Sequence, residues 1–143
     1  MQISALLKAK GDEVVTIAPD ASVVDLVRAL ADHGIGALVV SRDGKTIEGI
    51  VSERDVVRRM ASGDGPVGDE TVESIMSTEV ATCEPQHQVE ELMTVMTERR
   101  VRHVPVVENG QLAGIVSIGD VVKSRIGELE RDRQELVEYI TAR

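Results

Sequence analysis

Aromatic side chains are almost absent from this chain. Its 143 residues include one Tyr and neither Phe nor Trp, so the core must be built from aliphatic side chains and Met. Proteins that bind single-stranded nucleic acid usually stack the bases on aromatic side chains, and the formal net charge of −9 repels a phosphate backbone. We therefore expect no nucleic-acid partner, although the local cluster of Arg99, Arg100 and Arg102 suits a small anion.

Long apolar runs are also absent, and cysteine is nearly so. No run approaches the roughly 20 apolar residues that a membrane-spanning helix needs, and the opening MQISALLKAKGDE lacks the pattern of a secretory signal. The one cysteine, Cys83, cannot form a disulfide within the chain, which suits a reducing compartment. These features favour a cytoplasmic protein with no membrane partner.

Sequence signatures of catalysis are missing. The chain contains no glycine-rich phosphate loop of the G-x-x-x-x-G-K type and no G-x-S-x-G elbow. Its three histidines lie in unrelated contexts without metal-ligand spacing. Cys83 has no neighbouring base and fits a buried structural thiol better than a nucleophile. We expect no enzyme activity, no metal and no catalytic cofactor; a redox regulator acting through Cys83 is an alternative.

What the sequence does contain is an internal repeat. GIVSERD occupies Gly49–Asp55, and GIVSIGD occupies Gly114–Asp120. Stepping backwards from these heptapeptides gives further identities in the same order: Glu13 with Glu79, Val14 with Val80, Thr16 with Thr82, Pro19 with Pro85, Val23 with Val89, Leu26 with Leu92, and Val40 with Val106. Self-similarity of this kind indicates two copies of one structural unit.

The extent of the repeat predicts the domain organisation. We expect one unit at residues 8–62 and a second at 74–127, joined by a linker at 63–73 whose Gly, Pro and acidic residues are typical of an exposed connection. The segment 2–10 is predicted to form a leading helix. The charged segment 128–143 is predicted to form a C-terminal helix that packs on the core or on a partner chain.

Each copy predicts the element order β-α-β-β-α. EVVTIAP and EVATCEP are short β-rich runs ended by proline, and an amphipathic helix follows each. The strands IGALVV and RHVPVV come next. They lead through RDGK and ENGQ, which are strong hairpin signals, to the strands IEGIVS and LAGIVS. A short helix is expected to open at the Asp of each heptapeptide.

A duplicated unit of this kind, closed each time by Gly-Ile-Val-Ser-x-x-Asp, resembles the cystathionine-β-synthase (CBS) domain family, and the tandem pair is similar to a Bateman module. The resemblance rests on IGALVV…GIVSERDVVRR and RHVPVV…GIVSIGDVVKS. It extends to stand-alone bacterial CBS-pair proteins with a similar C-terminal extension. It implies an α/β (α+β) fold in which two units pack about a pseudo-twofold axis. It also implies clefts for AMP, ADP, ATP, NAD or S-adenosylmethionine, and a homodimer.

The serine and aspartate of each heptapeptide suit a nucleotide. Asp120, placed at a helix start, can cap that helix or accept hydrogen bonds from ribose hydroxyls, as acidic residues do in dinucleotide-binding folds. The Ser117 hydroxyl can bond to the Asp120 N–H or to a ribose or phosphate, and a helix start favours an anion. Because Ser52 and Asp55 repeat the pattern, we expect nucleotide contact in at least one copy.

The resemblance implies further site residues. The adenine slots would be lined by Ile35, Gly36 and Ala37 of the first unit and by Val101, Arg102 and His103 of the second, with Ile50 and Ile115 as apolar walls and Lys10 at a cleft edge. We expect Gly36 and Ala37 to join the cleft of Ser117 and Asp120, and Arg102 and His103 to join the cleft of Ser52 and Asp55. The first unit departs from the family pattern, because Val39 stands where the second has Pro105.

The two copies are not chemically equal. Arg54 can hold a phosphate with two hydrogen bonds, whereas Gly119, at the corresponding position, cannot. The clefts should therefore differ in affinity or ligand, so that one takes AMP and the other takes NAD or stays empty. We expect a free-standing sensor of adenine nucleotides that acts on a separate, unknown partner; the competing hypothesis is a protein-interaction scaffold with empty clefts.

Overall fold

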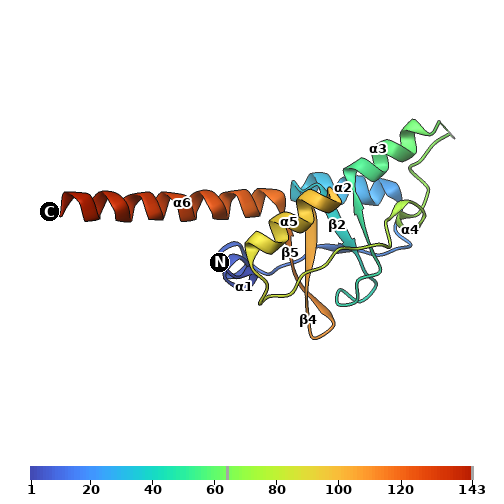
Figure 1. Ribbon diagram of the computed structural model, residues 1–143. Helices are drawn as coiled ribbons and strands as arrows, with labels where there is room; N and C mark the ends of the chain where they lie inside the picture. Colours follow the sequence, from blue (N-terminus) through green and yellow to red (C-terminus); the bar gives the residue numbers. More distant parts are fainter. Residues whose placement is uncertain (64, 143) are drawn as a thin grey trace.

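The computed structural model describes residues 1–63 and 65–142; residues 64 and 143, in the predicted linker and C-terminal extension, lie outside it. Two small sheets and their helices form a body from which the helix α6 projects (Figure 1). The elements, in chain order, are α1 (Ile3–Lys10), β1 (Thr16–Ile17), α2 (Val23–His33), β2 (Ala37–Val40), β3 (Gly49–Ser52), α3 (Glu53–Ala61), α4 (Val72–Ile75), α5 (Val89–Arg99), β4 (His103–Glu108), β5 (Gln111–Ser117) and α6 (Ile118–Thr141).

The first half follows the predicted element order. Strand β1 pairs in parallel with β2, which pairs antiparallel with β3 so that Ala37 lies opposite Ser52. The helices α2 and α3 pack on this sheet, and Leu26, Leu38 and Val51 are buried between the layers. This half is thus a small core of aliphatic side chains, as the lack of aromatic residues requires.

The second half lacks the first strand that we predicted at residues 79–85. Cys83 forms an isolated parallel bridge to Val106, with its N–H donating to the Pro105 carbonyl and its own carbonyl accepting from the Val107 N–H. Pro105 has no N–H with which to continue the ladder, whereas Val39 at the corresponding position of β2 has one. The described part of this half therefore contains the two-stranded sheet β4–β5 alone.

The leading helix of each unit packs on the other unit. Helix α1 precedes the first unit, yet its buried Leu6 and Leu7 belong to the core of the second. Helix α4, which we did not predict, opens the second unit, yet its Val72 is fully buried in the core of the first. Figure 1 shows α1 beside β5 and α4 beside α3. This exchange ties the two units together.

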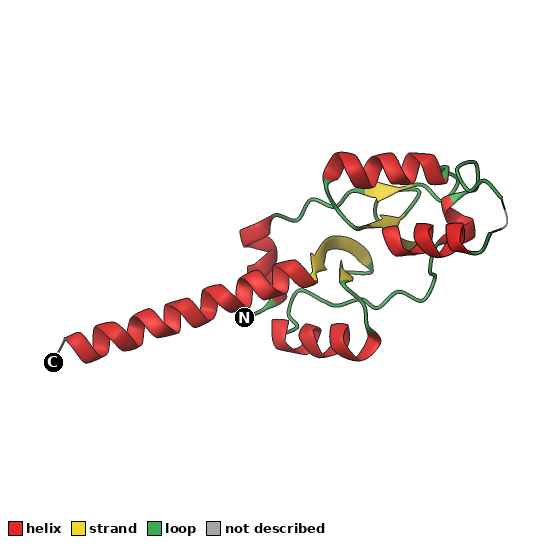
Figure 2. Ribbon diagram, turned by 90° about the horizontal axis from the view of Figure 1, so that it is seen from above, coloured by secondary structure: helices red, strands yellow, loops and turns green. Residues whose placement is uncertain are grey.

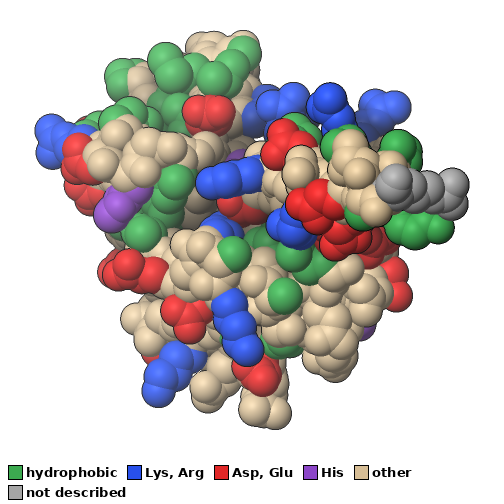
Figure 3. Space-filling model, turned by 90° about the vertical axis from the view of Figure 1, so that its left-hand side faces the viewer, with side chains coloured by type: hydrophobic (Ala, Val, Ile, Leu, Met, Phe, Trp, Pro, Cys, Tyr) green, Lys and Arg blue, Asp and Glu red, His purple; other side chains and the backbone are tan. Residues whose placement is uncertain are grey.

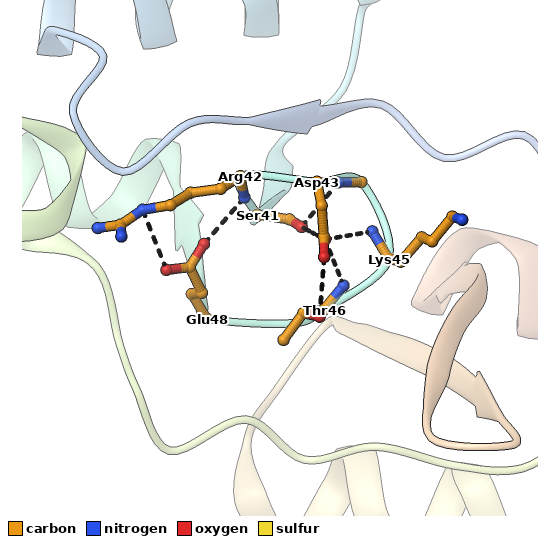
Figure 4. Close-up of polar contacts among 7 residues, drawn as sticks. Ser41, Arg42, Asp43, Lys45, Thr46 and Glu48 are labelled. Atoms are coloured by element: carbon orange, nitrogen blue, oxygen red, sulfur yellow. Dashed lines mark hydrogen bonds and ion pairs between the residues drawn. The ribbon is translucent and has the colours of Figure 1, made fainter.

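The two predicted hairpin turns differ. The second is a tight turn, in which Asn109 and Gly110 both have positive φ, as a two-residue hairpin requires. The first is a wider loop at residues 41–48, where the Asp43 carboxylate accepts hydrogen bonds from the backbone N–H groups of Lys45 and Thr46 (Figure 4). These hydrogen bonds hold the pKa of Asp43 far below its usual range.

Helix α6 replaces two predicted elements. The short helix of the second unit and the separate C-terminal helix are one continuous helix from Ile118 to Thr141. Its first turns pack on the body through Val121, which is fully buried. The rest does not fold back on the core, as one of our two expectations had it, but extends away from the body in both ribbon views (Figures 1 and 2). None of the helices in the described residues has the length and apolarity of a membrane span.

Candidate functional site

The repeated serine and aspartate begin the helices α3 and α6. Ser52 and Ser117 are the capping residues, and the aspartates are the third residues of their helices, so the prediction that the Asp opens each helix was wrong by two positions. In each case the serine hydroxyl accepts from the aspartate N–H, and the aspartate carboxylate accepts from the serine N–H at 2.8 Å. This reciprocal arrangement satisfies helix-start N–H groups that would otherwise lack partners.

The same capping arrangement occurs a third time, at Ser22 and Asp25 of α2. Those residues are outside every cavity described below. The Ser-x-x-Asp pattern therefore explains how a helix begins, and by itself it does not specify a ligand. Only its position in the fold makes Asp55 and Asp120 different from Asp25.

A cavity of about 470 Å³ lies at the start of α3, between the two units. It contains most of the residues that the sequence predicted for nucleotide binding, from both units: Gly36, Ala37, Ile50, Ser52, Arg54, Asp55, Val101, Arg102 and His103. Arg102 and His103 join Ser52 and Asp55 as predicted. Gly36 and Ala37, which we assigned to the cleft of Ser117 and Asp120, line this cavity as well.

Sequence reasoning missed part of the lining. The segment entering the second unit contributes Ser77, Glu79, Val80 and Ala81, and helix α3 contributes Glu53. The exchange of leading segments places Ser77 here: Ile50 and Ser77 exchange two backbone hydrogen bonds of 2.9 Å. The repeat alignment gave no sign that the opening segment of one unit lines the cleft at the helix start of the other.

Basic side chains concentrate around this cavity in an otherwise acidic protein. Its lining includes the arginines Arg54, Arg58, Arg99, Arg100 and Arg102 and the carboxylates of Glu53, Asp55 and Glu79. Acidic, basic and hydrophobic side chains all occur on the face shown in Figure 3. Guanidinium groups above a helix N-terminus are the usual protein arrangement for binding a phosphate.

Arg100 adopts an unusual backbone conformation. It ends α5 with φ 55° and ψ 41°, the left-handed region, which costs a non-glycine residue about 1 kcal/mol or more. At the corresponding end of α2, glycine occupies this position, since Gly34 has φ 63° and ψ 38°. The second unit therefore carries an arginine in a strained conformation where its side chain lines the cavity. Strain of this kind is typical of functional sites.

His103 lies between the two helix starts. Its ring is close to Gly36, with Cε1 3.6 Å from the place where a Cβ on that glycine would lie. Burial lowers the pKa of His103, and the opposing fields of Asp120 and Glu53 do not restore it. The imidazole is therefore mainly neutral at pH 7 and can act as either a hydrogen-bond donor or an acceptor.

The second helix start is arranged differently. Lys10 directs its ammonium group onto Asp120, with Nζ 2.5 Å from Oδ2, and donates a further hydrogen bond of 2.7 Å to the carbonyl of Ile115. Burial opposes ionisation of Asp120, but the hydrogen bonds from Lys10 and Ser117 outweigh it and hold its pKa below the usual range. Lys10, predicted at a cleft edge, thus neutralises the second carboxylate.

Two other predicted residues lie elsewhere. Ile35 is partly exposed and lines a separate hollow between α2 and α3. Cys83 is confirmed as a buried thiol: its Sγ lies 3.8 Å from the Pro105 carbonyl oxygen, and burial raises its pKa to about 11. A thiol that resists ionisation is a poor nucleophile, which counts against the redox alternative acting through Cys83.

Fold and cavity together define a protein built from two CBS units. Residues 10–62 and 72–127 both match the CBS domain family, and the chain belongs to that family. A mitochondrial CBS domain-containing protein of Arabidopsis thaliana is 34% identical over 146 residues, which span 96% of this chain and 71% of that one. A CBS domain-containing protein of Bacillus subtilis is 27% identical, over 80% of each chain.

Solved structures agree with this assignment. A CBS-domain protein from Agrobacterium tumefaciens is 44% identical and superposes with a TM-score of 0.83, over 87% of this chain and 99% of that one. The predicted tandem CBS pair with an α/β (α+β) fold is therefore confirmed, apart from the missing first strand of the second unit and the merged helix α6.

Proposed function

We propose that this protein is a regulatory sensor that binds one adenine nucleotide in the cavity of Ser52 and Asp55 and reports its occupancy to a separate protein through a homodimer. The observation that carries the proposal is the composition of that cavity. Both CBS units contribute to its wall, and the arginines gather there around the start of α3. Its volume of about 470 Å³ is within the roughly 300–1,000 Å³ range of small-molecule sites.

Each part of a nucleotide has a candidate contact. The hydrogen bonds from Ser52 use Oδ2 of Asp55, and we assign Oδ1 to a ribose hydroxyl. The half-buried Ile50 and the buried Ala37 offer an apolar wall to adenine. The phosphates would lie at the start of α3, where Arg54 and its neighbouring arginines can pair with them.

The comparisons support the chemical class of the ligand. The CBS domain pair of protein MJ0100, which shares this fold at 22% identity and a TM-score of 0.76, was solved in complex with 5′-methylthioadenosine and S-adenosyl-L-methionine. Both ligands contain adenosine. The arginines of the present cavity favour adenosine ligands that carry phosphate groups, so AMP, ADP, ATP and NAD are the candidates.

The proposed mechanism is a shift between two arrangements of the units. A nucleotide in this cavity touches Asp55 on one side and Arg102 and His103 on the other, so it fixes the orientation of the first unit relative to the second. It shifts the equilibrium only by the difference between its affinities for the two arrangements. No chemical step is required, and we propose a regulatory rather than a catalytic protein.

Calorimetric titration of the purified, ligand-stripped protein with AMP, ADP, ATP, NAD and S-adenosylmethionine tests this function. The site variant is Asp55→Ala, and its matched control is Asp25→Ala. Both remove a capping carboxylate from the third position of a helix, at a cost of about 1 kcal/mol, but only Asp55 lines the cavity. We expect micromolar binding that falls at least tenfold in Asp55→Ala and is unchanged in Asp25→Ala.

Two results would contradict the proposal. Equal affinity in both variants would remove Asp55 from the site. Absence of binding by all five compounds to the unmodified protein would favour the interaction-scaffold hypothesis, for which the exposed apolar residues of α6 are the specific structural support.

A further inference from the structure

Helix α6 carries exposed apolar side chains at regular intervals. Val122, Ile126, Leu129, Leu136 and Ile140 are all between 49% and 67% exposed. With Arg133 included, successive members are separated by alternating steps of four and three residues. This is the a/d spacing of a two-stranded coiled coil rather than the broader face of a helix packed on a globular core. We call these six positions the α6 seam.

The seam points away from the body. Helix α6 contacts the body through Val121, through Ser124, whose hydroxyl bonds to the Met1 sulfur, and through Glu128, which pairs with the N-terminal amino group. At 100° per residue these three positions share one side of the helix, and the seam is centred about a third of a turn away. A second helix can therefore lie along the seam without displacing the body.

The charges flanking the seam favour a second copy of the same helix. In a parallel pair aligned residue for residue, Arg125 at a g position lies opposite the partner's Glu130 at an e position, and the symmetric contact repeats it. Arg133, the one charged seam residue, lies beside the partner's Asp132. Outside the seam, the b, c and f positions from residue 127 onward hold polar or small residues, so the apolar surface is confined to one stripe.

The energetics point the same way. An isolated helix in water is marginal unless an apolar face is buried, and α6 extends for 24 residues with its seam in solvent. Burying both copies of Leu129, Leu136 and Ile140 would remove this exposed surface.

We propose that α6 of one chain pairs with α6 of a second copy as a parallel, in-register coiled coil along the seam. The proposal rests on the homodimer of the proposed function and names its contact surface, but it does not depend on nucleotide binding. The two CBS pairs of the dimer then lie at the same end of the coiled coil. This coiled coil connects them, so a conformational change in one pair can affect the other.

Disulfide trapping tests the geometry. The native Cys83 is buried with a raised pKa, so an added thiol reports alone. We expect Leu136→Cys, on the seam, to form a disulfide-linked dimer under mild oxidation at low micromolar concentration. The matched control Glu138→Cys, two residues away on the opposite side of α6, should crosslink at least tenfold more slowly. Equal crosslinking rates of the two variants would overturn the proposal. A Leu136→Cys variant that does not crosslink would also overturn it, because in an antiparallel pair the two copies of residue 136 lie apart.

Light scattering tests the contribution of the seam to assembly. The double variant Leu129→Glu/Leu136→Glu should halve the molar mass of the unmodified protein, while Glu138→Lys should leave it unchanged. Calorimetry on the double variant keeps the two proposals separate, because nucleotide should still bind to each chain with its original affinity. A double variant that keeps the original mass would show that the protein does not assemble through α6.

Discussion

The two helix starts that close the CBS units share one local geometry but differ in access. At the first, Ser52 and Asp55 border an open cavity, and the segment entering the second unit pairs with Ile50 through its backbone alone. At the second, Lys10 reaches both the Ile115 carbonyl and Asp120. Identical capping motifs therefore provide one carboxylate available to a ligand and one already paired with a cation.

The exchange of leading segments explains this difference. Lys10 lies at the start of the first unit but contacts the second, and the repeat places it in register with Met76, which lies at the start of the second unit but packs on the first. The opening residues of each unit thus contact the closing heptapeptide of the other unit, and at Lys10 this contact pairs the Asp120 carboxylate with a cation. In this protein, each of the two helix starts is therefore surrounded by residues from both units.

The most direct way to break the difference is Lys10→Met, which gives the second cleft the residue found beside the first. Loss of the ammonium leaves Asp120 without its ion pair. We expect the variant to bind a second nucleotide per chain, measured by calorimetry, with a loss of stability below about 1 kcal/mol because the pair is partly exposed. An unchanged stoichiometry would show that Lys10 does not close the second cleft.

The glycines of the two heptapeptides sharpen the comparison of packing. A Cβ on Gly49 would lie 2.7 Å from the Ser77 carbonyl oxygen, whereas one on Gly114 would lie 2.9 Å from the tip of the Leu7 side chain. The Leu7 side chain can shift to make room for an added methyl group, whereas the Ser77 backbone, held by hydrogen bonds, cannot. We expect Gly49→Ala to lower the free energy of unfolding by about 2 kcal/mol and Gly114→Ala by less than about 1 kcal/mol, measured by urea denaturation. Equal losses would contradict the close contact of the leading segment with β3.

Arg100 allows the ends of α5 and α2 to be compared directly. Arg100→Gly should raise the free energy of unfolding by up to about 1 kcal/mol, because glycine adopts the left-handed conformation without strain. The same change removes an arginine from the cavity and should weaken nucleotide binding several-fold. Denaturation and calorimetry on one sample measure both effects. A less stable variant would contradict the strain at Arg100, and a variant that binds nucleotide normally would contradict its role in binding.

The smallest expected effect concerns pH, through His103. Its folded pKa lies below the ordinary 6.5, so as pH falls below 6.5 the unfolded state takes up a proton that the folded state resists, and stability decreases. Asp120, whose folded pKa is below 3.8, contributes stability that is lost only under about pH 4. Between pH 7 and 5 the unfolding free energy should therefore fall less in His103→Asn than in the unmodified protein. If the unfolding free energies of both proteins fall equally with pH, His103 does not contribute to this loss of stability.

Much of the architecture followed from the sequence, because it depended on local patterns. The repeated heptapeptide located both helix starts, and Asn109–Gly110 located a tight turn. The corresponding signal at RDGK failed, since the first copy has one more residue there and the Asp43 carboxylate organises a wider loop. The first strand of the second unit is missing because Pro105 has no N–H to donate. The sequence shows that Pro105 replaces Val39 of the first unit, but we did not predict the loss of the strand from it.

The composition of the site was harder to predict, because it depends on contacts between distant segments. Pseudo-symmetry brought Arg102 and His103 to Asp55, as expected. It did not indicate that α1 and α4 exchange units, and so it could not show that Ser77 lines the open cavity or that Lys10 pairs with Asp120. Such contacts are set by burial of Leu6, Leu7 and Val72, and apolar residues of this kind pack equally well on either unit when judged from sequence alone.

The central claim is that the cleft of Ser52 and Asp55 is the open one. Its most direct test is calorimetric titration of the unmodified protein, Asp55→Ala and Asp120→Ala with the nucleotide that binds best. The account predicts one nucleotide per chain, with binding lost in Asp55→Ala and kept in Asp120→Ala. Binding that is kept in Asp55→Ala and lost in Asp120→Ala would contradict it.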